Sequence, residues 1–156
     1  MLEELSVRNY ALVESLSLSF GRGFSVLTGE TGAGKSLLVG ALSVILGGKA
    51  EIESIRTGKE EAVVSGVFNV LGNPEAQAWL SERDIHPEEG AVIVRRTVKR
   101  QGRGGIYMQN VPVTRSDLGE FADLLVDLHS QHEHQSLFNE ENHRKLLDRY
   151  GECEEL

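Results

Sequence analysis

Residues 29–36 read GETGAGKS, which matches the Gly-x-x-x-x-Gly-Lys-Ser pattern of a phosphate-binding loop. The glycines allow positive φ angles, so that several backbone N–H groups can turn toward one point. The short apolar stretch 24–29 leads into the loop, and the long apolar stretch 35–46 follows from it. This order of strand, loop and helix predicts an α/β fold of the P-loop NTPase class.

The loop residues have distinct roles if they bind a nucleotide. The N-terminal end of the following helix would point its positive dipole at the phosphates. Lys35 would reach the β- and γ-phosphates, and Ser36 would hold Mg²⁺. The alternative is a glycine turn that carries a lysine and a serine without any phosphate. The loop residues predicted to contact the nucleotide are Gly29, Glu30, Thr31, Gly32, Ala33, Gly34, Lys35 and Ser36.

The composition sets limits on the kind of protein. Of 156 residues, 40% are hydrophobic and 26% charged, which suits one domain with its own core. No apolar run approaches the roughly 20 residues of a membrane span, and the N-terminus carries acids where a secretory signal would carry bases. Cys153 is the only cysteine, so no internal disulfide can form. These features predict a cytoplasmic protein without a membrane partner.

Hydrophobic periodicity predicts the secondary structure of the first half. A helix apolar on almost all sides, which we expect to be buried on most of them, should stop at Gly47 and Gly48. The segment that enters the loop is the candidate central strand. The expected strands are 2–10, 13–20, 24–29 and 61–71, and the expected helix is 35–46.

The second half reads as a helix, a hairpin and a further helix. Pro74 opens the first helix, and the stretch TRSD at 114–117 resembles a capping box before the second. Two strands joined by the turn QGRGG form the hairpin. The expected helices are 74–84, 117–125 and 139–150, and the expected strands are 91–100, 105–113 and 124–128.

The hairpin concentrates positive charge in an acidic chain. The net charge is −8, yet the stretch between Gly90 and Ser116 contains six basic residues and no acid. Clustered lysine and arginine neutralise phosphates without reading bases, so we predict sequence-independent DNA contact. The alternative is an exposed hairpin whose charge only balances the acidic remainder. The candidate DNA-binding residues are Arg95, Arg96, Lys99, Arg100 and Arg103.

Two further features bear on hydrolysis. No Asn-Lys-x-Asp guanine motif is present, which excludes a typical GTPase. Asp127 follows an apolar stretch and would be the Mg²⁺ acid of a compact kinase, or else it only ends a core strand; the next residue is Leu128 and not a glutamate. The stretch SQHEHQS at 130–136 could be a zinc site, a plain polar loop, or a glutamine that senses Mg²⁺ and water.

The loop GETGAGKS, the basic hairpin and the stretch DLHSQHEHQSL together resemble the RecN family of bacterial DNA-repair ATPases, which are related to SMC and Rad50 proteins. The opening stretch 5–36 also looks like an SMC-type head. The resemblance implies an ABC-type head lobe with a mixed sheet and a hairpin-rich subdomain. It implies that ATP and Mg²⁺ are bound, that Arg56 lies near the nucleotide, and that Gln131 contacts Mg²⁺ and acts in hydrolysis with Lys35. Gln135 is the less favoured glutamine.

The family carries parts that these 156 residues lack: a long coiled coil, a signature motif, an Asp-Glu pair and a switch histidine. The resemblance therefore implies that residues 1–156 are the N-terminal lobe of a split head. A C-terminal lobe, and a second head across sandwiched ATP, would complete an ATPase for DNA double-strand-break repair and recombination at the bacterial nucleoid. We expect weak or no turnover from the chain alone. The alternatives are a small-molecule kinase that uses Asp127 and a non-hydrolysing nucleotide-binding module.

Overall fold

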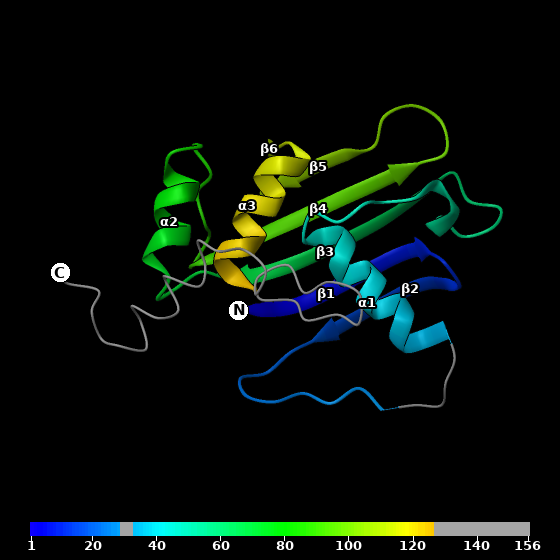
Figure 1. The fold of residues 1–156 in the computed structure, drawn as a ribbon, viewed down its shortest axis with the longest axis horizontal. Coiled ribbons are helices and arrows are strands. Elements are labelled where there is room, and N and C mark those ends of the chain that lie inside the picture. The colour runs from blue at the N-terminus through cyan, green and yellow to red at the C-terminus, as the bar shows by residue number, and fades with distance from the viewer. Residues whose placement is uncertain (29–32, 127–156) are drawn as a thin grey trace, which may run out of the picture. The chain divides into compact units, whose positions relative to one another are not determined.

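The computed structural model describes residues 1–28 and 33–126. The chain divides into two units, Met1–Leu125 and Val126–Leu156, and the account below concerns the first. Its centre is a six-stranded sheet in the order β2-β1-β3-β4-β5-β6, antiparallel at each pairing (Figure 1). The strands are β1 (Leu2–Tyr10), β2 (Val13–Ser19), β3 (Glu61–Asn69), β4 (Ala91–Lys99), β5 (Gly105–Met108) and β6 (Val111–Pro112).

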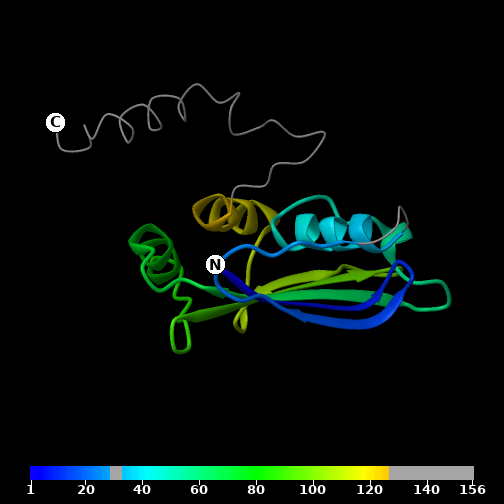
Figure 2. The same ribbon diagram turned by 90° about the horizontal axis from the view of Figure 1, so that it is seen from below.

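The helices lie on one face of this sheet. Figure 2 shows α1 (Ala33–Ile45) and α3 (Arg115–Leu125) on the same side, with α2 (Pro74–Ser81) beyond one end of the strands. Alternation along the strands makes this face apolar. On β3, for example, every second residue from Ala62 to Phe68 is buried while the residues between them are partly exposed. A short 3-10 helix, η1 (Ile52–Ser54), follows α1.

α1 lies close to the sheet because glycines leave room for the side chains between them. Ile45 is fully buried and occupies the space above Gly66 of β3, where a Cβ would overlap its Cδ1 atom. The Tyr10 hydroxyl lies under the helix, 3.1 Å from the position that a Cβ on Gly40 would take. The buried residues Leu37, Ala41 and Val44 complete this face. The opposite flank is not covered by the described residues, and Val39 is 47% exposed there.

The C-terminal end of α1 rests against α3. Gly47 has φ +94°, a conformation that glycine adopts readily and other residues do not. A Cβ at this position would lie 2.9 Å from the Cα atom of Gly119 in α3. Gly47 therefore serves both to end the helix and to allow this close approach.

α3 begins with the predicted capping box. The Thr114 hydroxyl accepts from the Asp117 N–H (3.1 Å), and the Asp117 carboxylate accepts from the Thr114 N–H (2.9 Å) and hydroxyl (2.6 Å). These hydrogen bonds hold the pKa of Asp117 below its usual value.

Aromatic side chains join α3 to the sheet and to α2. Phe121 of α3 packs on Phe68 of β3 and on Trp79 of α2, with ring centroids 6.2 Å and 5.4 Å apart. Arg83 lies over the Trp79 ring and pairs with Glu120 at 3.1 Å.

Most predicted elements are confirmed, and four expectations need correction. The single strand expected at 105–113 is two short antiparallel strands, β5 and β6, because residues 109–110 form a turn. Residues 24–28 form no strand and are exposed. Leu124 and Leu125 end α3 instead of starting a strand. α1 is buried along one face and not on most sides. The fold class is confirmed, although the parallel pairing that a mixed sheet requires is not found among the described strands. In the described ranges, no helix is long and apolar enough to cross a membrane.

Candidate nucleotide-binding site

The first turn of α1 carries the described part of the phosphate-binding motif. Gly34 and Ser36 are exposed and Lys35 is half-buried. The turn contains no acidic residue, so no carboxylate within it offsets the positive end of the helix dipole. Free N–H groups, an ammonium and a hydroxyl are the donors that a phosphate needs, and a hydroxyl is also a Mg²⁺ ligand. Gly29, Glu30, Thr31 and Gly32 lie outside the described residues.

The segment that leads into the loop is apolar and exposed. Phe24 is 93% exposed, Val26 63% and Leu27 49%. Val39 on α1 is 47% exposed as well, so the described part of the chain leaves all four of these apolar side chains in water. Apolar surface exposed in this way usually marks a contact with other protein.

The segment that carries Arg56 is firmly attached to the sheet. Ile55 is buried and forms an isolated bridge with Tyr10 at the end of β1. The Arg56 N–H donates to the Asn9 carbonyl at 2.9 Å. From the hairpin, the Arg100 guanidinium donates to the carbonyls of Ile55 (3.1 Å) and Lys59 (2.8 Å). The backbone around Arg56 is therefore held from both sides.

The Arg56 side chain is about one-third exposed and pairs with Glu14 of β2 at 3.5 Å. Its segment follows η1, which lies toward the same end of the sheet as the β1–β2 turn and the N-terminal end of α1 (Figures 1 and 2). This placement is compatible with a nucleotide at α1, and contact between Arg56 and the nucleotide stays a prediction.

The basic hairpin has two faces. Arg95 and Lys99 of β4 are exposed on the face away from α1. The Arg95 guanidinium lies 5.8 Å from the centroid of the Tyr107 ring, and the Lys99 ammonium lies 3.9 Å from a Glu61 carboxylate oxygen. Arg103, in the turn, is exposed as well. These three side chains are accessible to a phosphate backbone.

Arg96 corrects the prediction that all five basic residues face solvent. It is only 8% exposed, and its Nη1 atom donates to the carbonyls of Val44 (2.7 Å) and Gly48 (2.6 Å) at the end of α1. The side chain is thus enclosed under the helix and unavailable to DNA. The sequence of β4 already indicated this orientation. Arg96 lies two residues from both Val94 and Val98, so it is on the same face of the strand as these apolar residues. Arg100 remains exposed, but it already donates to two backbone carbonyls.

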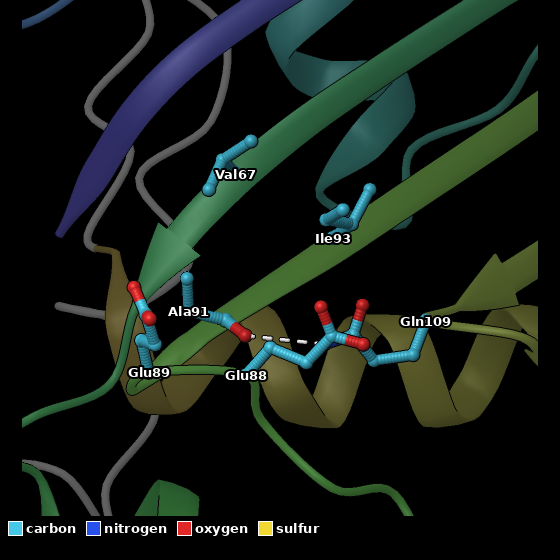
Figure 3. A pocket seen from close by; sticks show the side chains of 6 residues that line it. All are labelled: Val67, Glu88, Glu89, Ala91, Ile93 and Gln109. Carbon is cyan, nitrogen blue, oxygen red and sulfur yellow. Dashed lines mark hydrogen bonds between the residues drawn. The ribbon is translucent and has the colours of Figure 1, made fainter.

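A hollow on the sheet lies apart from the motif. Figure 3 shows its lining, which includes Val67 and Ile93 with Glu88 and Glu89 at the edge, and its volume is about 670 Å³. It contains no lysine or arginine, and two carboxylates beside an apolar floor would repel a triphosphate. Across the two described ranges, no group of three or more histidine, cysteine or acidic residues could hold a metal ion. The first turn of α1 therefore remains the candidate phosphate site.

The other residues predicted to act on the nucleotide lie outside the described residues. These are Gln131 and Gln135, the two candidate Mg²⁺ glutamines, and Asp127, the acid of the kinase alternative. The histidines around them, for which a zinc site was an alternative, also lie outside that range.

The fold resembles the P-loop NTPase heads of SMC proteins. A solved structure from work on ATP-driven dimerization and DNA-stimulated activation of SMC ATPases matches with a TM-score of 0.65 at 22% identity, over 96% of this chain and 98% of that one. The SMC head domain from Thermotoga maritima matches with a TM-score of 0.57 at 21% identity, over 76% of this chain and 41% of that one. At such identities the likeness concerns the fold.

The AAA domain family matches residues 4–152, and the chain belongs to this family. It is 53% identical over 97% of its length to the DNA repair protein RecN of Treponema pallidum, and 38% identical over 99% of its length to that of Bacillus subtilis. The expected resemblance to RecN proteins is confirmed over nearly the whole chain. The chain spans 26% and 27% of the length of these two relatives.

Proposed function

We propose that residues 1–156 are the ATP-binding N-terminal lobe of an SMC-like ATPase head that acts in DNA double-strand-break repair and recombination, in the bacterial cytoplasm at the nucleoid. The observation that carries this proposal is the acid-free first turn of α1, which presents Lys35 and Ser36, the last two residues of the loop motif. The 53% identity to a DNA repair protein supports the biological setting. A kinase has no comparable support.

Each residue of the motif has a task in this proposal. Backbone N–H groups at the start of α1 bind phosphate oxygens, and Lys35 adds a positive charge beside the β- and γ-phosphates. The Ser36 hydroxyl is one ligand for Mg²⁺, with Gln131 as a second and Gln135 as its substitute. Arg56 binds phosphate from the segment that Tyr10 and Arg100 hold in place. ATP bound to Mg²⁺ supplies the hydrolysable γ-phosphate bond.

The site described so far is half of a hydrolytic site. We propose that a C-terminal head lobe, joined through a coiled coil, covers the exposed apolar segment 24–28 and the uncovered flank of α1. The exposure of Phe24 and Val26 supports this, as does the fourfold greater length of the RecN relatives. A second head would close over the ATP, as the dimerization of the similar SMC ATPases suggests by analogy. The isolated chain then binds ATP with little turnover.

Nucleotide binding is tested with a fluorescent ATP analogue and Mg²⁺. We expect Lys35→Ala to weaken binding by about 10- to 100-fold, the effect of losing one charge-assisted hydrogen bond. Lys49→Ala is the matched control, because Lys49 is exposed and pairs with Glu51 just beyond the far end of α1, so the affinity of this variant should stay unchanged. Equal affinity of Lys35→Ala and wild type would refute the proposed site. Rapid formation of a phosphorylated small molecule would instead support the kinase.

DNA binding is tested through its salt dependence. In a variant with Arg95, Lys99 and Arg103 all changed to glutamine, we expect weaker salt dependence on duplex DNA. The magnitude of the slope of log affinity against log salt should fall by about 3, since each phosphate contact contributes about 0.9. The control variant carries Arg22→Gln and Lys49→Gln, which remove exposed charge outside the β4–β5 hairpin, and its slope should fall by less than 1. An unchanged slope in the triple variant would count against DNA contact by the hairpin.

A further inference from the structure

We propose that Arg96 is a positioning residue of the nucleotide site: from β4 it fixes the C-terminal end of α1, and through the helix it fixes Lys35 and Ser36 at the other end. This inference rests on the proposed function of α1 as the phosphate-binding helix. It replaces the DNA contact predicted for the same residue with a role inside the fold.

The contacts of Arg96 match the chemistry of a helix end. The last carbonyls of a helix lack intrahelical partners and form the negative end of its dipole. The Arg96 Nη1 atom donates to Val44 in the last turn and to Gly48 just beyond it, at 2.7 Å and 2.6 Å. Burial and the charge of Arg115 lower the pKa of the Arg96 guanidinium, yet arginine stays protonated in proteins. A buried cation here is therefore balanced by carbonyl dipoles.

Other close approaches of α1 differ in kind from these two hydrogen bonds. Ile45 above Gly66, Tyr10 below Gly40 and Gly47 against Gly119 are close approaches that set how near the helix lies to its neighbours. Such apolar contacts allow the helix to rotate or slide by a small amount. The two hydrogen bonds from Arg96 are directional, because a guanidinium is planar and its donors are fixed. They set the rotation and axial position of α1 against the sheet.

A helix carries such a restraint along its length. α1 has 13 residues, about 20 Å at 1.5 Å per residue. Its backbone hydrogen bonds make it rigid over that distance, so a tilt at Val44 displaces the first turn as well. Misplacement of a phosphate-binding group by about 1 Å can cost a large part of its effect.

Arg100 makes the same kind of contact beside Arg56, the other residue predicted to bind the nucleotide. It donates to the carbonyls of Ile55 and Lys59, on either side of Arg56. Arg96 of β4 therefore contacts the helix that bears Lys35, and Arg100, the residue directly after β4, contacts the segment that bears Arg56. This arrangement supports a positioning role for both arginines, one buried and one exposed, and distinguishes them from the candidate DNA contacts Arg95 and Arg103.

The test compares two variants at position 96 for binding of the fluorescent ATP analogue. Arg96→Met keeps the bulk of the stem and removes the donors, and we expect affinity to fall about tenfold. Arg96→Lys keeps one cationic donor and should recover part of the loss. Leu80→Ala is the control: it creates a cavity at the α2 corner and should lower the melting temperature while leaving affinity within about twofold of wild type. Amide exchange in the second turn of α1, residues 37–40, where the N–H groups first have intrahelical partners, should rise in both Arg96 variants and not in Leu80→Ala.

The outcomes separate this inference from the proposed function. Wild-type affinity and exchange in Arg96→Lys and Arg96→Met, alongside a large loss in Lys35→Ala, would overturn the positioning role alone. An equal loss in Leu80→Ala would overturn it too, since the effect would then follow stability. No loss in Lys35→Ala would refute the site itself. If Arg96→Met does not fold, Arg96→Lys decides: faster exchange at residues 37–40 with weaker binding supports the inference, and wild-type behaviour overturns it.

Discussion

Phe121→Ala should lower the free energy of unfolding by about 3–5 kcal/mol, the usual cost of removing a buried phenylalanine side chain. Phe121 is 1% exposed and joins three elements, because its ring meets Phe68 of β3 edge-on and Trp79 of α2 at a tilt. The cavity would lie where α2 and α3 meet the sheet, with little else to fill it. Urea unfolding followed by the fluorescence of Trp79, the only tryptophan, measures the loss directly.

Phe24→Ala is the matched control for this change. It deletes the same atoms from a ring that is 93% exposed, so we expect a change within about 0.5 kcal/mol. A large loss in Phe24→Ala would show that residues 21–28 pack in solution, contrary to the structure. A loss below about 1 kcal/mol in Phe121→Ala would contradict the packing of this corner.

Gly47→Ala is the second change expected to cost much. The residue would be strained at φ +94°, by about 1–3 kcal/mol. Its Cβ would also meet the Gly119 backbone at 2.9 Å, and backbone cannot rotate away as a side chain can. Overpacking adds about 1–3 kcal/mol, so we expect a total loss of about 2–6 kcal/mol. Thermal and urea unfolding measure it.

Gly58→Ala separates these two causes. Gly58 also has a positive φ, +78°, but a Cβ there meets nothing within 4 Å. Its cost should be the conformational part alone, about 1 kcal/mol. The difference between the two variants is the contact of α1 with α3. Equal losses at the two positions would mean that Gly47 and Gly119 do not approach each other closely.

Much of the fold could be predicted from local patterns. Alternation located β1 to β4, the Gly47-Gly48 pair located the end of α1, and the Thr114–Asp117 box located the start of α3. The hairpin of β4 and β5 followed from its glycine-rich turn. These signals are local, because each depends on a side-chain period or on a cap within a few residues.

The errors arose where the outcome depends on distant parts of the chain. Residues 24–28 are rich in β-forming side chains, but strand propensity describes fit to a half-buried sheet, and the described strands offer this segment no partner. Leu124 and Leu125 read as a strand, yet the capping box and the packing of Phe121 extend a helix through them. The order of strands around β1 could not be read from the sequence, because it depends on where α1 crosses the sheet.

In the candidate site, the phosphate-binding motif could be identified from the sequence, but the residues that hold its helix in place could not. Lys35 and Ser36 were identified by spacing alone. Arg96 holds the end of α1 through Gly48, which lies 48 residues away in the sequence. Arg100 holds the Arg56 segment through Ile55, which lies 45 residues away. The clustering of positive charge suggested DNA contact for both arginines instead. Only the parity of Arg96 with Val94 and Val98 indicated that its side chain turns inward.

The exposed segment before the loop also affects how this chain behaves in concentrated solution. FSVLT at 24–28 is uncharged and free of proline, and its side chains favour β-structure; such segments pair with copies of themselves when nothing covers them. Arg22 and Glu30 flank it with charge, which opposes stacking in register. Self-association through this stretch should therefore rise with salt, as screening weakens the flanking repulsion. Work with the isolated chain is best done at low salt and low concentration.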